Sequence, residues 1–193
     1  MTWSLGYLPP RHPELLDALF LTVGRSLHLA NAFEEKCRWM VRCIKLVEMH
    51  KNKEEIVMDD DGMITNLPKD KMLADTLTRL TGKISTPDEI MQVLRRATKA
   101  RNFIAHEGAS VGDISAVREQ HILAHARRLR PAVLELAEGD NIVSQWGFHF
   151  EEPRQSLPQD LIEAYPQMID EWVFGHFGNL LDGEVANSTV MTL

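Results

Sequence analysis

An arginine, an asparagine and a histidine lie within six residues of one another, at Arg101, Asn102 and His106. A histidine titrates near neutral pH and can move protons, and an arginine fork binds phosphate oxygens through parallel hydrogen bonds. Cleavage of RNA by attack of its 2'-hydroxyl can use these two groups without a metal ion. The three residues therefore predict a site that binds and cleaves a phosphodiester.

The helix that must position these residues is predicted over residues 85–106, after a Ser-Thr-Pro start and before Gly108. Arg101 projects at the edge of its apolar face, where a guanidinium must reach water, pair with a carboxylate, or meet an anion in a cleft or interface. Glu34, or its neighbour Glu35 in the long N-terminal helix, is a candidate partner across the bundle or between subunits, although a solvated surface position is the commoner fate of such residues. The apolar face consists of Ile90, Val93, Leu94, Ala97, Ala100 and Ile104.

The polar side of the same helix groups further residues with the motif. Asn102 and His106 are four apart, so their side chains lie one above the other, and Arg95 and Lys99 are candidate RNA-binding cations. The alternative is that Arg101 and His106 only stabilise the C-terminal end of the helix, where cations favour the dipole. Geometry alone favours this alternative.

The segment from Ala100 to Glu107, with the sequence ARNFIAHE, resembles the motif of HEPN domains. In that family an arginine is followed by four to six residues and a histidine, commonly with a polar residue after the arginine, as Asn102 is here. The resemblance covers about eight residues of motif and the helical order of residues 13–138. The chain departs from one subgroup of the family, in which a modifiable tyrosine lies two residues after the histidine. Gly108 occupies that position here, so control by nucleotidylation is not expected.

The resemblance implies a function and partners. HEPN ribonucleases cut RNA without metal or cofactor, pair their motifs across a homodimer, and often act as toxins or in phage defence with an antitoxin or regulatory protein. It implies that Arg101, Asn102 and His106 are catalytic. The alternatives are a non-catalytic HEPN module that binds nucleotide, RNA or a protein partner, and an unrelated helical interaction protein. The net charge of −7 favours the non-catalytic module somewhat.

Composition describes a folded chain with an uneven charge distribution. Its 193 residues suit one domain, with 44% hydrophobic and 25% charged residues. Residues 151–193 hold eight acidic side chains against Arg154 alone, so the rest of the chain is neutral overall. This argues against coating of nucleic acid by bulk charge but allows local basic patches.

No leader pattern or stretch of roughly 20 apolar residues is present, so we expect a cytoplasmic protein without membrane contact.

The hydrophobic pattern predicts an all-α fold, a HEPN-like up-and-down bundle of about five to seven helices. Helices are expected over residues 13–52, 68–80, 85–106, 113 or 115–139, and 157–177. We expect Gly24 to divide or bend the first helix, and Pro131 to kink or break the fourth. Residues 141–150 are the segment that best fits a strand instead. The chain is thus predicted as one domain, residues 1–193, with a core over about 13–138, an acidic helical extension over 151–181 and a loose tail over 182–193.

Other groups of residues are weaker candidates. His121 and His125 have a spacing that could hold zinc, but no third ligand is apparent, so a solvated or packed pair is favoured. Cys37 and Cys43 are expected to be reduced thiols. The acidic segment 58–67 lacks the ligand spacing of a calcium loop. Six aromatic residues near the C-terminal end could form a binding platform, but packing into the core is favoured. They are Trp146, Phe148, Phe150, Trp172, Phe174 and Phe177.

Overall fold

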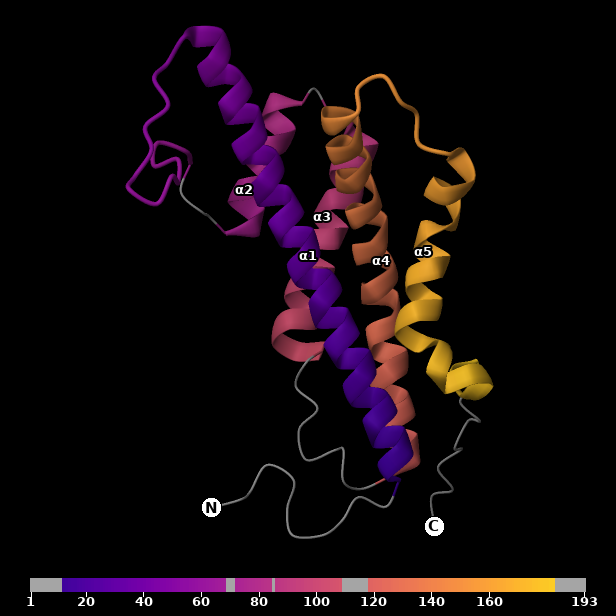
Figure 1. Ribbon diagram of the computed structural model, residues 1–193. Coiled ribbons are helices and arrows are strands. Elements are labelled where there is room, and N and C mark those ends of the chain that lie inside the picture. Colours follow the sequence, from indigo (N-terminus) through magenta and orange to yellow (C-terminus); the bar gives the residue numbers. More distant parts are fainter. Residues whose placement is uncertain (1–11, 69–71, 85, 109–117, 183–193) are drawn as a thin grey trace, which may run out of the picture.

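The computed structural model describes residues 12–68, 72–84, 86–108 and 118–182, which form an all-α bundle without strands (Figure 1). The all-α prediction is confirmed. In Figure 1, α3, α4 and α5 alternate in direction, whereas α2 runs in the same direction as α1 because the segment after α1 turns back along it. The helices are α1 (Pro13–Asn52), α2 (Leu73–Lys83), α3 (Asp88–Phe103), α4 (Glu119–Glu151) and α5 (Gln159–Phe174), with a π-helix η1 (Ile104–Gly108) and a 3-10 helix η3 (Gly175–Leu181).

The core lies where α1, α3 and α4 pack together. Phe33 of α1 and Leu136 of α4 are completely buried there. A Cβ atom at Gly139 would lie only 2.3 Å from the Cβ of Ala97, so this glycine allows α3 and α4 to approach closely. Close packing of these two helices fixes the position of the motif at the end of α3.

Several predicted boundaries are wrong. Helix α1 continues through Gly24 without division, because buried neighbours such as Val23 and Ser26 anchor that turn, and a glycine costs a helix only about 1 kcal/mol. Helix α4 continues past Pro131 to Glu151 and includes residues 141–150, so the strand alternative is wrong. Its apolar residues meet the core at helical spacing, which a short run in the sequence does not distinguish from alternation. The second helix begins at Leu73, later than predicted.

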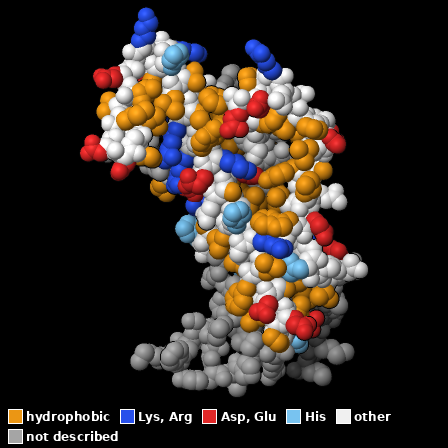
Figure 2. All heavy atoms as spheres, viewed as in Figure 1, with side chains coloured by type: hydrophobic (Ala, Val, Ile, Leu, Met, Phe, Trp, Pro, Cys, Tyr) orange, Lys and Arg blue, Asp and Glu red, His pale blue; other side chains and the backbone are white. Residues whose placement is uncertain are grey.

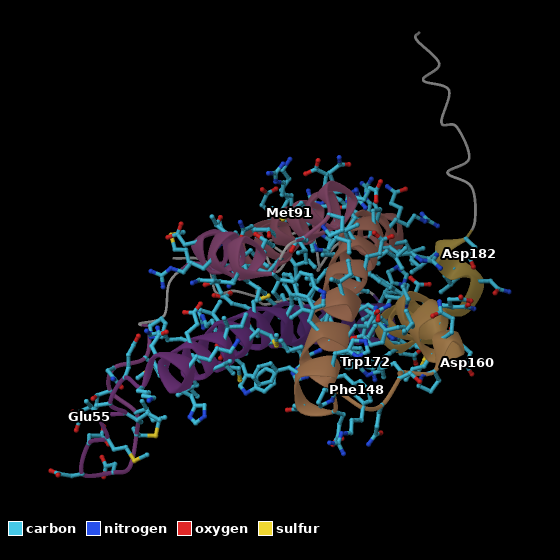
Figure 3. The ribbon with its side chains drawn as sticks, turned by 90° about the horizontal axis from the view of Figure 1, so that it is seen from above. Glu55, Met91, Phe148, Asp160, Trp172 and Asp182 are labelled. Atoms are coloured by element: carbon cyan, nitrogen blue, oxygen red, sulfur yellow. The ribbon has the colours of Figure 1, made fainter. Side chains whose placement is uncertain are left out.

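Residues 53–68, here called the arm, leave the end of α1 and project from the bundle, as Glu55 shows in the view from above (Figure 3). An isolated antiparallel bridge joins Met58 and Ile64. Oδ1 of Asp59 accepts hydrogen bonds from the backbone N–H groups of Asp61 (3.2 Å) and Met63 (2.8 Å). This carboxylate therefore closes a turn, consistent with rejection of a calcium loop.

The acidic C-terminal region packs onto α1 and α4 as α5 and η3. Val173, Phe174 and Phe177 are buried in the same core cluster. Trp172 stays 39% exposed and Phe150 40% exposed, so the aromatic residues divide between core and surface and form no single platform. No helix in the described part of the chain is long and apolar enough to cross a membrane. The predicted loose tail lies outside the described residues except for Asp182.

Candidate functional site

A pocket of about 450 Å³ opens where the end of α3 meets the middle of α1 and the start of α2. All three motif residues line it, although they lie at the C-terminal end of one helix. Helix α1 contributes a carboxylate and a guanidinium, and α2 contributes its first residues. The lining consists of Glu34, Arg38, Met72, Leu73, Ala74, Arg101, Asn102 and His106.

His106 reaches this pocket through a change in helix type. Helix α3 ends at Phe103, and the chain continues as the π-helix η1, whose backbone hydrogen bonds join residues five apart. A regular α-helix would separate Arg101 and His106 by roughly 140° around its axis, at 3.6 residues per turn. The wider π turn rotates less per residue and brings His106 toward Arg101 while keeping it above Asn102. Local widening of the helix thus brings the motif residues to one surface.

Arg101 is paired across the bundle within the same chain. Its Nη2 forms an ion pair with Glu34, which is only 6% exposed, and its Nη1 donates a hydrogen bond of 3.2 Å to Oδ1 of Asn102. The candidate pairing of Glu34 with Arg101 is therefore present in the structure, within one chain, and Glu34 is buried instead of solvated. The buried Nε of Arg101 has no hydrogen-bond partner among the described residues. Arg101 is thus oriented by α1 and by its own neighbour.

A second arginine, Arg38, was not singled out by the sequence analysis. It lies one turn after Glu34 on α1 and forms ion pairs with Glu34 and with the exposed Glu35. Glu34 therefore bridges two guanidinium groups, Arg38 and Arg101, at the wall of the pocket. The i,i+4 spacing of Glu34 and Arg38 was a signal in the sequence, but it is too common on helices to indicate a site.

The pocket lining has a positive balance. Two guanidinium groups stand against one carboxylate, and the exposed imidazole of His106 adds a further hydrogen-bonding group. The first residues of α2 also line the pocket, and no described side chain caps that helix. Unpaired N–H groups and the positive dipole end of a helix favour anions. The arrangement suits an anion with several oxygen acceptors.

Positive charge continues outside the pocket. The predicted RNA-binding residues Arg95 and Lys99 do not line it, but both are exposed on α3. Lys99 lies three residues before Asn102 and Arg95 lies four before Lys99, so the side chains follow one face of the helix. Figure 2 also shows Lys and Arg side chains gathered between the arm and the body of the bundle.

The two histidines considered for zinc have different environments. His121 is exposed, whereas His125 is 6% exposed and its Nε2 lies 2.8 Å from the carbonyl oxygen of Gly108. Since a carbonyl only accepts, Nε2 carries the proton and donates it. No group of three or more His, Cys, Asp or Glu side chains suited to a metal ion is present among the described residues.

A second buried carboxylate lies on the other side of α1. Asp140 of α4 is fully buried and accepts hydrogen bonds from Lys36 Nζ at 2.9 and 2.8 Å and from the Tyr165 hydroxyl. Lys36 also donates to Ser144 at 2.9 Å. Burial, together with the nearby charges of Asp140 and Glu34, raises the pKa of the Cys37 thiol. Cys37 is thus an unreactive core thiol, as expected, and both cysteines are free.

No protein-family model, curated protein or solved structure matches this chain. The resemblance to HEPN domains therefore depends on the motif residues and on the helical order.

Proposed function

We propose that this protein is a metal-independent endoribonuclease of the HEPN type. The observation that supports the proposal most directly is that Arg101, Asn102 and His106 line one pocket whose charged side chains are in positive balance. A phosphodiester carries the charge and the acceptor oxygens that such a pocket suits. Arg95 and Lys99 would contact the RNA backbone beyond the pocket.

The proposed reaction is an internal transesterification. Arg101 holds the non-bridging oxygens of the scissile phosphate, and Asn102 orients the arginine. His106 accepts the proton of the 2'-hydroxyl as the 2'-oxygen forms its bond to phosphorus and the bond from phosphorus to the 5'-oxygen breaks. The leaving oxygen must receive a proton, so the products are a 2',3'-cyclic phosphate and a 5'-hydroxyl.

One imidazole cannot act as base and acid in the same step. A twofold homodimer would bring a second His106 to the site as the acid, as the family resemblance implies. Specific activity should therefore fall when the protein is diluted below the dissociation constant of the dimer, which analytical ultracentrifugation measures independently.

The test is incubation of purified protein with RNA in EDTA. We expect cleavage that leaves 2',3'-cyclic phosphate ends, and a decrease of at least about 100-fold in His106→Ala and Arg101→Ala. His121→Ala, an exposed histidine of α4, is the matched control and should retain full activity. Equal activity in the wild type and His106→Ala would contradict the proposal.

A second candidate is a HEPN module that binds nucleotide, RNA or a protein partner without cleaving it. The ion pair between Glu34 and Arg101 favours this function, because a carboxylate already occupies the phosphate-binding arginine. In that case the wild type binds RNA without cutting it, and His106→Ala changes melting temperature or dimerisation instead.

The resemblance also suggests a toxin or phage-defence role with an antitoxin or regulatory protein. Expression of the wild type should then arrest bacterial growth, and expression of His106→Ala should not. Arrest by both proteins at equal levels would argue that cleavage is not the cause.

A further inference from the structure

Three residues of α4 contact the end of the motif helix. His125 donates a hydrogen bond of 2.8 Å to the carbonyl of Gly108, and the guanidinium of Arg128 lies 5.3 Å from the ring centre of Phe103. Leu129, which is fully buried, packs against Gly108. Residues 125, 128 and 129 share one face of α4, so this helix contacts the residue before the π turn and the last residue of the turn.

The close approach at Gly108 depends on the absence of a side chain. A Cβ atom there would lie 2.5 Å from Cδ2 of Leu129. Because Leu129 has no exposed surface, it cannot move aside without disturbing the core. The glycine thus lets the last carbonyl of the π turn reach the imidazole of His125.

This hydrogen bond replaces one that the helix cannot make. Helix η1 ends at Gly108, and the last carbonyls of a helix have no partner within it. Single π turns are rare and need support from the surrounding structure. His125 supplies that support from inside the core, at 6% exposure, where a lost partner would leave the buried carbonyl unsatisfied.

We propose that His125 is a positioning residue of the candidate site, which by its hydrogen bond to Gly108 keeps the π turn and so holds His106 in the pocket beside Arg101. The proposal deepens the proposed ribonuclease function and rests on it. His125 does not line the pocket and acts on the reaction only through the backbone of Gly108.

Two amide substitutions separate the hydrogen bond from other effects of changing His125. His125→Gln can place an N–H donor close to the position of Nε2, whereas His125→Asn carries the same amide on a side chain one methylene shorter and cannot reach Gly108. We expect kcat for RNA cleavage to fall about 10-fold or more in His125→Asn, with KM within about twofold, and to recover in His125→Gln. His121→Asn on the same helix is the control and should leave kcat unchanged.

A second measurement does not require cleavage. Inorganic phosphate is titrated into each protein, and the ring resonances of His106 are followed by NMR. We expect a saturable shift in the wild type and in His125→Gln, and loss of that shift in His125→Asn with the remaining spectrum still dispersed. Retention of the shift in both variants, loss in both, or no shift in the wild type would overturn the positioning role. A wild type that shows this pattern but does not cut RNA would overturn the proposed function and leave the role of His125 intact.

Discussion

Two buried carboxylates, Asp140 and Glu34, lie on either side of α1, and they differ in how completely their surroundings are closed. Asp140 has no exposed surface, and one lysine, one hydroxyl and the packing of α5 enclose it. Glu34 is also buried, but its two arginine partners line a pocket of about 450 Å³.

The difference shows when a buried ion pair is structural and when it can bind a ligand. At Asp140 the lysine and the tyrosine hydroxyl direct their donors at the carboxylate, and Lys36 gives a further donor to Ser144. At Glu34 one carboxylate bridges two guanidinium groups, which also donate to Glu35 and Asn102, and these two arginines line an open pocket. Because both guanidinium groups line the pocket, an anion that enters it can contact them. We therefore infer a structural role for Asp140 and propose a ligand-binding role for the surroundings of Glu34.

The largest expected effect is on stability. Asp140→Asn should lower the free energy of unfolding by about 3 kcal/mol, because Asp140 has no exposed surface and the amide N–H groups of asparagine would face the donors of Lys36 and Tyr165. Glu34→Gln should cost only about 1 kcal/mol, because the arginines can reach water in the pocket. Urea unfolding of both variants measures the difference. Equal losses would contradict the assignment of different roles.

The next effect is on phosphate affinity, and here substitution of Glu34 should have a larger effect than substitution of Asp140. Glu34→Gln should strengthen binding of inorganic phosphate about 10-fold, equivalent to roughly 1.4 kcal/mol, because the competing carboxylate charge is removed from Arg38 and Arg101. Asp140→Asn should leave phosphate affinity unchanged. Isothermal titration calorimetry at fixed ionic strength provides the measurement, and weaker binding in Glu34→Gln would show that orientation of the arginines outweighs competition.

Arg38 and Lys36 give a matched pair of cations on α1, one on each side. Arg38→Ala should weaken phosphate binding about fivefold, which corresponds to roughly 1 kcal/mol for the loss of a charge-assisted hydrogen bond. Lys36→Ala removes the same charge at Asp140 and should not change the affinity measurably. A similar decrease in both variants would mean that the pocket senses only the total charge of the protein.

The smallest effect concerns alkaline pH. Burial, followed by the charge of Asp140 and the hydrogen bond to it, raises the pKa of Tyr165 above its ordinary value of 10.0. The folded state therefore holds the phenol proton more tightly, so this contribution to stability is complete below about pH 10 and is lost as the pH rises above it. Tyr165→Phe should unfold with a flatter dependence on pH above about 10 in chemical denaturation. An unchanged slope would exclude Tyr165 as the titrating group.

The helical wheel of residues 85–106 was sufficient to place Arg101 at the edge of the apolar face and to require a partner for it. Glu34 could be suggested because helices of this length pack side by side, although no spacing rule links residues so far apart in the chain. Arg38, the start of α2 and His125 could not be found in this way. Their relation to the motif depends on which faces of α1, α2 and α4 meet the end of α3.

The sequence by itself determined the all-α class, because apolar residues at helical spacing recur along the chain, and it determined the identity and order of the motif residues. Only the tertiary structure decided that His106 shares a pocket with Arg101. A π turn is unfavourable in an isolated helix, and here Gly108 packs against Leu129 while His125 binds the last carbonyl. These contacts come from α4, so the local sequence of the motif cannot encode them.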